Sequence, residues 1–375
     1  MSFLQKSSDR KVSWLELFFD LVFVALIAQL TYHFSHHHHT LEDFMQVGLV
    51  GYMIFFAWIG TTANRNLRKD EDIIDIICIQ FQMLLIMVMS LTLTQAFGVY
   101  SWLFFSAMAF NGFISLFMIR RFYNLHPNKR PQTLNVWWGL FTAACLWGLT
   151  GFIPLPYLYV AAGCALLTNM FAASTTGKNN KVILLDMDHL LERLGLFLLM
   201  VMGEAVLVVA LANSVAKEFD LFRLTIVLSG LLIMIALWWL YFPYIDTHAK
   251  GQRAKWFQVM LQTHGFLYGS LILIAAGLKI IIENPQIAAE KTWIFLAGMA
   301  LMIITFNIIR SSLTHHIAEG FKSTLDFLLP LGVITISCII WQIPAFLVVA
   351  ATAVLMLAYV FCDYKKHFGN KAVIH

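Results

Sequence analysis

Long apolar runs recur along the whole chain, and each has about the length that a helix needs to cross a bilayer. Roughly 20 consecutive apolar residues cross about 30 Å of hydrocarbon as a helix. Twelve such runs lie near residues 14–34, 44–63, 73–95, 99–119, 133–152, 155–173, 190–212, 222–243, 258–282, 292–310, 325–341 and 344–362. The sequence therefore predicts an all-α, polytopic integral membrane bundle with about 12 transmembrane helices, or ten if one hairpin is miscounted.

The composition agrees with this architecture. Of 375 residues, 60% are apolar and only 12% are charged, whereas soluble domains carry about 25% charged residues. The first apolar run contains acids and lacks a small-residue cleavage site, so we expect it to remain as a helix rather than to act as a signal peptide. The five cysteines are scattered through apolar stretches without a metal or disulfide spacing, so we expect them to be packing residues.

The distribution of lysine and arginine predicts the orientation. With both termini in the cytoplasm, only Lys217, Arg223, Lys279 and Lys291 fall on the outer side. All other basic residues then lie on the inner side, as the positive-inside rule requires. We therefore expect a cell-membrane protein, multi-pass in the inner or plasma membrane, with both ends cytoplasmic.

The two halves of the sequence resemble each other. "AMAFNGFISLFMIRR" is similar to "GMALMIITFNIIR", and "MIFFAWIG" is similar to "MIALWWLYF". Six helices per half would make the repeats parallel, with halves at residues 1–180 and 181–375. The alternative is chance similarity between two apolar stretches of like composition.

Most charged residues near helix ends fit a structural role. Acids at helix starts and cations at helix ends interact favourably with the helix dipole, at about 0.3–1 kcal/mol each. An acid of one helix can also pair with an arginine of the next. This structural or pairing group comprises Glu16, Glu192, Arg120 and His189.

Two acids lie deeper than this explanation allows. Asp20 is one helical turn beyond Glu16, and Glu204 falls past the middle of its run. We expect Asp20 to pair with Arg120 or Arg310, while Arg193 shares a helix face with Glu204. Intramembrane acids commonly serve as proton or ion sites, and the alternative for both is hydrogen-bonded packing.

Several motifs resemble those of the bacterial low temperature requirement A (LtrA) family of multi-pass membrane proteins. They are "ELFFDLVFV" (16–24), "HLLERLGLFLLMVMGEAVLVV" (189–209), "LWWLYF" (237–242) and "THGFLYGSLILIAAG" (263–277). Met202 departs from the leucine that the family has before its Gly-Glu pair. The resemblance implies a membrane protein named for growth in the cold, but no particular reaction. The motif positions that carry over are Glu16, Asp20, His189, Glu192, Arg193, Glu204 and His264.

A histidine run, "HFSHHHHT", lies in the first predicted outer loop. Its residues His36, His37, His38 and His39 could collect a transition metal, although consecutive histidines in a loop are more typical of a solvated segment. Phosphate-binding, nucleophile and zinc-protease motifs are lacking in the sequence. We therefore expect no enzyme, no cofactor and no nucleic-acid binding.

Transport or permeation of a small solute or ion, with proton coupling, is the function we expect from these features. Its partners would be the lipid bilayer and the unidentified solute or ion. The alternative is a non-transporting membrane protein that supports growth or envelope homeostasis at low temperature. The candidate ion, proton or substrate site consists of Asp20, Glu204, Arg193, His264 and Arg310.

Overall fold

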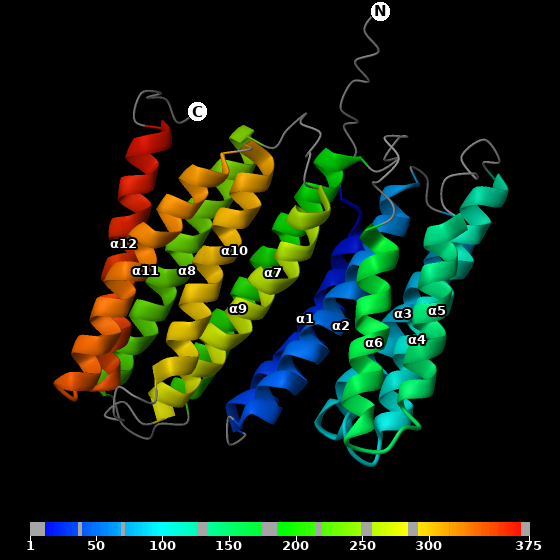
Figure 1. The fold of residues 1–375 in the computed structure, drawn as a ribbon, viewed down its shortest axis with the longest axis horizontal. Coiled ribbons are helices and arrows are strands. Elements are labelled where there is room, and N and C mark those ends of the chain that lie inside the picture. The colour runs from blue at the N-terminus through cyan, green and yellow to red at the C-terminus, as the bar shows by residue number, and fades with distance from the viewer. Residues whose placement is uncertain are drawn as a thin grey trace, which may run out of the picture. The chain divides into compact units, whose positions relative to one another are not determined.

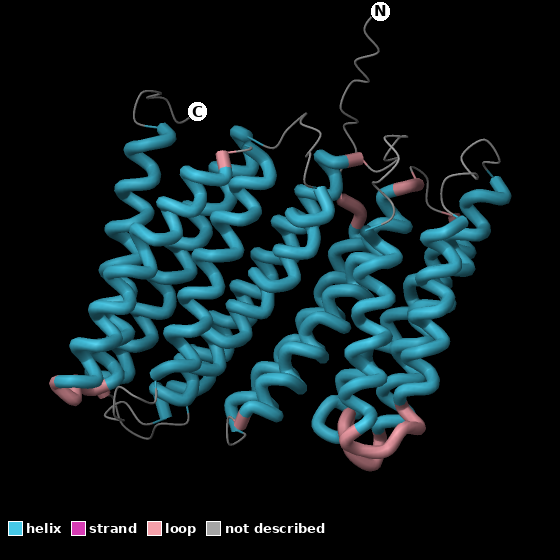
Figure 2. Tube along the Cα trace, viewed as in Figure 1, coloured by secondary structure: helices cyan, strands magenta, loops and turns pink. Residues whose placement is uncertain are grey.

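The computed structural model describes residues 12–36, 40–68, 72–125, 134–174, 186–214, 220–248, 257–283, 292–314 and 316–368. Over these ranges the regular structure is helical and contains no strand (Figures 1 and 2). The α-helices are α1 (Trp14–His36), α2 (Leu41–Asn66), α3 (Ile73–Thr92), α4 (Ser101–Leu125), α5 (Leu134–Thr150), α6 (Tyr157–Ser174), α7 (Met187–Ser214), α8 (Leu221–His248), α9 (Phe257–Glu283), α10 (Trp293–Thr314), α11 (Ile317–Ile340) and α12 (Ala345–Phe368).

The membrane-bundle fold class is confirmed, because every predicted apolar run corresponds to one helix. Within the described ranges, ten helices are long and apolar enough to cross a bilayer. The other two, α5 and α6, have 17 and 18 residues, which is near the lower limit for spanning. The choice between ten and twelve spans stays a prediction.

Local sequence signals define several helix starts. Ser13 and Glu16 bond reciprocally at the start of α1, which makes a capping box. Thr40 and Asp43 form the same arrangement at the start of α2. The helix α11 begins at Ile317, earlier than the predicted residue 325. Its first turns carry charged residues, which lower the hydropathy of this stretch but do not prevent a helix.

The chain divides into two compact units, Met1–Phe197 and Leu198–His375, and the division falls inside α7. In the first unit, α1 packs against α2 and α3, and α4 packs against α2, α3 and α5. The helix α6 contacts α2 and α5. The first turns of α7 belong to this unit, and they complete the candidate site.

In the second unit, α9 and α10 form the most extensive helix pair, and α8 packs against α9, α10 and α12. The helix α11 contacts α10 and α12. Many large apolar side chains on both units are exposed, as expected for surfaces that face lipid. The prediction of two parallel six-helix repeats, with a boundary at residues 180 and 181, stays a prediction.

Candidate functional site

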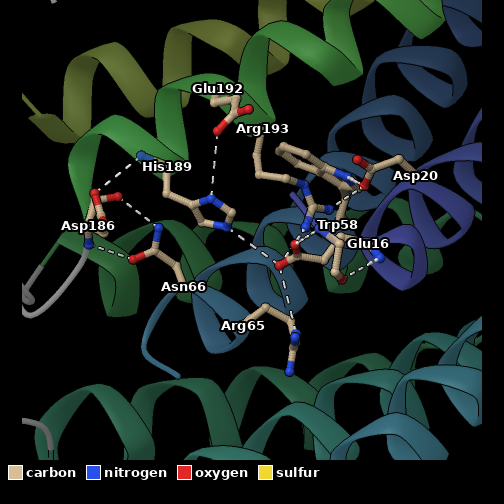
Figure 3. Close-up of polar contacts among 10 residues, drawn as sticks. Glu16, Asp20, Trp58, Arg65, Asn66, Asp186, His189, Glu192 and Arg193 are labelled. Atoms are coloured by element: carbon tan, nitrogen blue, oxygen red, sulfur yellow. Dashed lines mark hydrogen bonds and ion pairs between the residues drawn. The ribbon is translucent and has the colours of Figure 1, made fainter. Parts of the chain in front are cut away.

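Three helix segments of the first unit bring buried charges together (Figure 3). They are the first two turns of α1, the last turns of α2 and the first two turns of α7. We call Glu16, Asp20, Arg65, His189 and Arg193 the charge cluster; each of these residues is at most 4% exposed. Charged residues are rarely buried to this extent unless they are paired.

Glu16 lies at the centre of the charge cluster, where it contacts three basic side chains. Its Oε1 lies 3.1 Å from Nη1 of Arg193, 3.6 Å from Nε2 of His189 and 3.8 Å from Nε of Arg65. Its Oε2 accepts a hydrogen bond of 2.9 Å from the backbone N–H of Ser13. One side chain therefore caps α1 and ties it to α2 and α7, which fits the structural or pairing role predicted for Glu16 and His189.

Asp20 lies one turn further along α1 and is fully buried. Its Oδ1 accepts hydrogen bonds from Nη2 of Arg193 at 2.5 Å and from the indole Nε1–H of Trp58 at 2.7 Å. Its Oδ2 has no hydrogen-bond partner among the described residues. The predicted partners of Asp20, Arg120 and Arg310, were wrong: Arg120 is exposed and Arg310 pairs with Asp363.

The two terminal nitrogens of Arg193 reach different carboxylates, so this one guanidinium bridges Glu16 and Asp20. The guanidinium also lies over the ring of Trp58, at 5.9 Å from its centroid. Trp58 in turn stacks on Phe197, with ring centroids 4.4 Å apart. This packing fixes the Trp58 indole, so that its N–H is directed at Asp20.

A second set of contacts joins the end of α2 to the start of α7. Nδ2 of Asn66 donates to the backbone carbonyl of Asp186 at 2.8 Å, and the N–H of Asp186 donates to Oδ1 of Asn66 at 2.7 Å. The carboxylate of Asp186 caps α7 by accepting from the N–H of His189. Glu192, 3.9 Å from Nδ1 of His189, is half exposed and flanks this end of the charge cluster (Figure 3).

The charge cluster contains two carboxylates and two guanidiniums, so its formal charges balance when His189 is neutral. Ionised groups out of water are stable only when they are well paired, because desolvation of each charge costs several kcal/mol. A cation or proton that occupies one carboxylate would therefore compete directly with an arginine. The charge cluster can hold three helix segments together, and its ion pairs can also be weakened when a cation or proton binds to a carboxylate.

Another group of charges lies at the start of α3 and the end of α4. Asp75 pairs with both Arg68 and Arg121, and Arg121 also bonds to Asp72. The hydrogen bond from Arg121 lowers the pKa of Asp72 below its ordinary value. These contacts confirm the prediction that an acid at one helix start pairs with an arginine at the end of the next helix.

The remaining predicted site residues belong to the second unit. Arg310 on α10 pairs with Asp363 on α12 at 2.6 Å and lies 5.0 Å from the ring centroid of Tyr244. Glu204 on α7 is 9% exposed, and no ion pair or hydrogen bond joins it to another described residue.

His264 on α9 is fully buried and has two partners. Its Nδ1 lies 2.7 Å from the backbone carbonyl of Met260, and its Nε2 lies 2.9 Å from the hydroxyl of Tyr241. The carbonyl can only accept, so Nδ1 carries the proton and Nε2 accepts from Tyr241. These contacts fit a hydrogen-bonded packing group.

The histidine run lies mostly outside the described residues, which include His36 but not His37, His38 and His39. Nδ1 of His36 lies 2.8 Å from the backbone carbonyl of Tyr32, within α1. Over the described residues, no group of three or more histidines, cysteines or acids is placed to hold a metal ion.

Several residues of these networks were not predicted from the sequence as members of a site, among them Arg65, Trp58, Asn66, Asp186 and Asp363. Trp58 and Asn66 offered a signal, since a buried indole N–H or amide requires a hydrogen-bond partner. A buried donor indicates only that a hydrogen-bond partner exists. It does not identify that partner, which lies on a distant segment of the chain.

The fold and the charge cluster define a class: a polytopic helical membrane protein with a buried network of acids and arginines. The sequence model of the family described as bacterial low temperature requirement A protein (LtrA) matches residues 11–361 of the chain. The chain therefore belongs to the LtrA family, as its motifs predicted.

The chain is also similar to one curated protein. Over 268 residues the chain is 26% identical to the uncharacterized protein RA0937 of Rhizobium meliloti (strain 1021). The match covers 67% of this chain and 61% of that protein, so the chain spans less than two thirds of the relative's length. No solved structure matches the chain.

Proposed function

We propose that this LtrA-family protein transports or conducts a small solute or ion across a bacterial membrane, and that a proton or a monovalent cation acts on Asp20. The protein works as a transporter rather than as an enzyme, and both its ends are cytoplasmic. One observation carries the proposal: Asp20 is fully buried, its Oδ1 is shared by two donors, and its Oδ2 has no partner among the described residues.

The chemistry of that carboxylate gives the mechanism. A proton or cation on Oδ2 withdraws negative charge from Oδ1, which weakens the hydrogen bond from Arg193. Arg193 is the link between α1 and the start of α7, so its release loosens these helices from each other. Binding of the ion is thereby coupled to helix movement, as alternating access requires.

Glu204 provides the second titrating group of the proposal. It is an acid inside a membrane-spanning helix, and acids in this position are characteristic of ion and proton pathways. The replacement Glu204→Gln keeps the size and most of the hydrogen-bonding capacity but removes the charge.

The test uses the full-length protein reconstituted into liposomes, with charge movement recorded on a supported membrane after jumps in H⁺, Na⁺ or K⁺ concentration. We expect a current from the wild type that is lost in Glu204→Gln. It should also be lost in the double variant Asp20→Asn/Arg193→Gln, which removes both charges of the pair and keeps polar side chains at both positions. Glu319→Gln changes an exposed acid at a helix start and is the matched control, so its current should remain.

One alternative has its own support in the structure. Glu16 contacts three basic side chains, and Asn66 and Asp186 bond twice, which is the pattern of a permanent lock between helices. A folded wild type that gives no more current than protein-free liposomes for any of the three ions would reject transport. It would favour a non-transporting protein that stabilises the membrane or envelope in the cold.

A further inference from the structure

A neutral polar cluster lies in the membrane-embedded middle of the first unit, apart from the charge cluster. Gln82 is at the centre of α3 and Asn111 is near the centre of α4, and they are 0% and 1% exposed. Nε2 of Gln82 donates to Oδ1 of Asn111 at 2.7 Å and to Oγ of Ser115 at 3.0 Å. Burying two carboxamides in an apolar bundle is unfavourable unless all of their polar atoms are bonded.

The hydrogen bonding of this amide pair is half complete. Two facing carboxamides can form two N–H···O bonds with each other, but those of Gln82 and Asn111 form one; Nε2 of Gln82 also lies 3.4 Å from the backbone carbonyl of Asn111. Oε1 of Gln82 and Nδ2 of Asn111 have no hydrogen-bond partner among the described residues. Turning both amides by 180° exchanges donor and acceptor and again leaves one of each open, so the count does not depend on how the amide atoms are assigned.

The two open atoms define the molecule that would satisfy them. It must accept a hydrogen bond from an amide N–H and donate one to an amide carbonyl. A neutral molecule fits this position, because a buried ion would be desolvated without a counter-charge from either amide. Water is the smallest molecule of this kind, and buried waters typically bond to groups that the protein leaves unsatisfied.

The surrounding side chains connect this position to one end of the bundle. Nδ2 of Asn64, near the end of α2, donates to the backbone carbonyl of Ser115 at 3.2 Å. Asn64 is 3% exposed and precedes Arg65 of the charge cluster. Polar groups thus follow one another from the end of α2 to the middle of α3 and α4, within an otherwise apolar interior.

We infer that Gln82 and Asn111 hold a buried water molecule between α3 and α4, beside this series of polar groups. The site does not depend on the proposed transport, because its basis is the unsatisfied amide pair alone. The water completes the bonding of both carboxamides and fixes the contact between the two helices.

Hydroxyl-radical footprinting by X-ray radiolysis tests this directly, because radicals formed from a bound water attack the side chains beside it. Met108 lies one turn before Asn111 on the same face of α4, is 4% exposed, and carries a sulfur that oxidises readily. Met302 on α10 is 0% exposed and serves as the internal control. We expect oxidation of Met108 in the folded, full-length wild type, read by mass spectrometry, while Met302 stays at background.

The double variant Gln82→Leu/Asn111→Leu removes both amides and should reduce the oxidation of Met108 to the level of Met302. Unchanged oxidation in that folded variant would overturn the inference. If the variant does not fold, the wild type alone provides a second test. Footprinting in H₂¹⁸O must then place the heavy oxygen on Met108, and oxidation of Met108 no faster than that of Met302 rejects the site.

Discussion

A single carboxylate oxygen connects three helix segments in the first unit. Oδ1 of Asp20 accepts from Arg193 on α7 and from Trp58 on α2, while Asp20 itself belongs to α1. The side chain is fully buried, so neither donor can be replaced by bulk water. The stability of this junction therefore depends on Asp20 remaining charged.

Asp20→Asn should destabilise the protein strongly, because Arg193 then loses one of its two anionic partners in a buried setting. Removing one member of a buried ion pair typically costs about 3–5 kcal/mol. The loss can be measured as a lower Tm of the detergent-solubilised protein. The double variant Asp20→Asn/Arg193→Gln should recover part of it, since the cation left without Asp20 is then absent and Glu16 keeps Arg65 and His189 as partners. Purely additive losses in the double variant would contradict a direct pair.

The sequence identified the acids of this junction but not the partner of Asp20. Depth along a helix follows from position in an apolar run, so Asp20 could be recognised as an intramembrane acid. Its partner depends on which helices become neighbours and at what height. Arg193 is 173 residues away, and the sequence placed it only on the same helix face as Glu204. Helical periodicity contains no information about contacts at that separation.

At the scale of helices, α9 and α10 show how this bundle achieves close packing. A Cβ atom on Gly277 would lie 2.6 Å from the backbone nitrogen of Phe295, and one on Gly298 would lie 2.9 Å from the backbone nitrogen of Ile274. Each helix therefore presents a glycine to the backbone of the other. Small residues at such crossings allow the dispersion contacts that hold helices together in lipid.

Gly277→Ala should separate α9 from α10, because the added methyl group meets backbone atoms that cannot rotate away. Overpacking of this kind typically costs about 1–3 kcal/mol. Gly269→Ala on the same helix is the control, since a Cβ there meets no atom within 4 Å. We expect a lower Tm for Gly277→Ala only, and a higher Tm for Gly269→Ala because alanine favours the helix. Equal Tm changes in the two variants would disprove the close approach.

Helix positions were the most predictable part of the fold, because hydropathy and length decide where a chain can span lipid. The twelve expected runs all correspond to helices, with the largest shift at the start of α11. Glu319 and Lys322 lie in that extension. Charged residues lower the hydropathy of a stretch, so a search for apolar runs excludes them, although they are compatible with a helix.

For the whole molecule, the asymmetry of basic residues predicts which ends of the helices face the cytoplasm. The start of α2 should face outward and the end of α4 should face inward. Leu41 is 79% exposed and Leu125 is 61% exposed, so cysteines introduced there will be accessible to a reagent on their own side.

In a variant lacking the five native cysteines, Leu41→Cys should react with a membrane-impermeant maleimide added to intact cells. Leu125→Cys should react only after the cells are opened. Labelling of both after lysis provides the control for reactivity. The reverse pattern in intact cells would contradict the predicted orientation. The depths of Asp20 and Glu204 would then have to be measured from the opposite face of the membrane.

The pairing of Asp20 with Arg193 also has a consequence for how the chain is made. At about 5–20 residues per second, a ribosome needs roughly 9 to 35 s to synthesise the 173 residues that separate them. During that interval the first helix has left the ribosome, but the arginine that neutralises its acid does not yet exist. The Asp20–Arg193 pair can therefore form only after α7 has been synthesised, so α1 reaches its final packing later than its position in the chain would indicate.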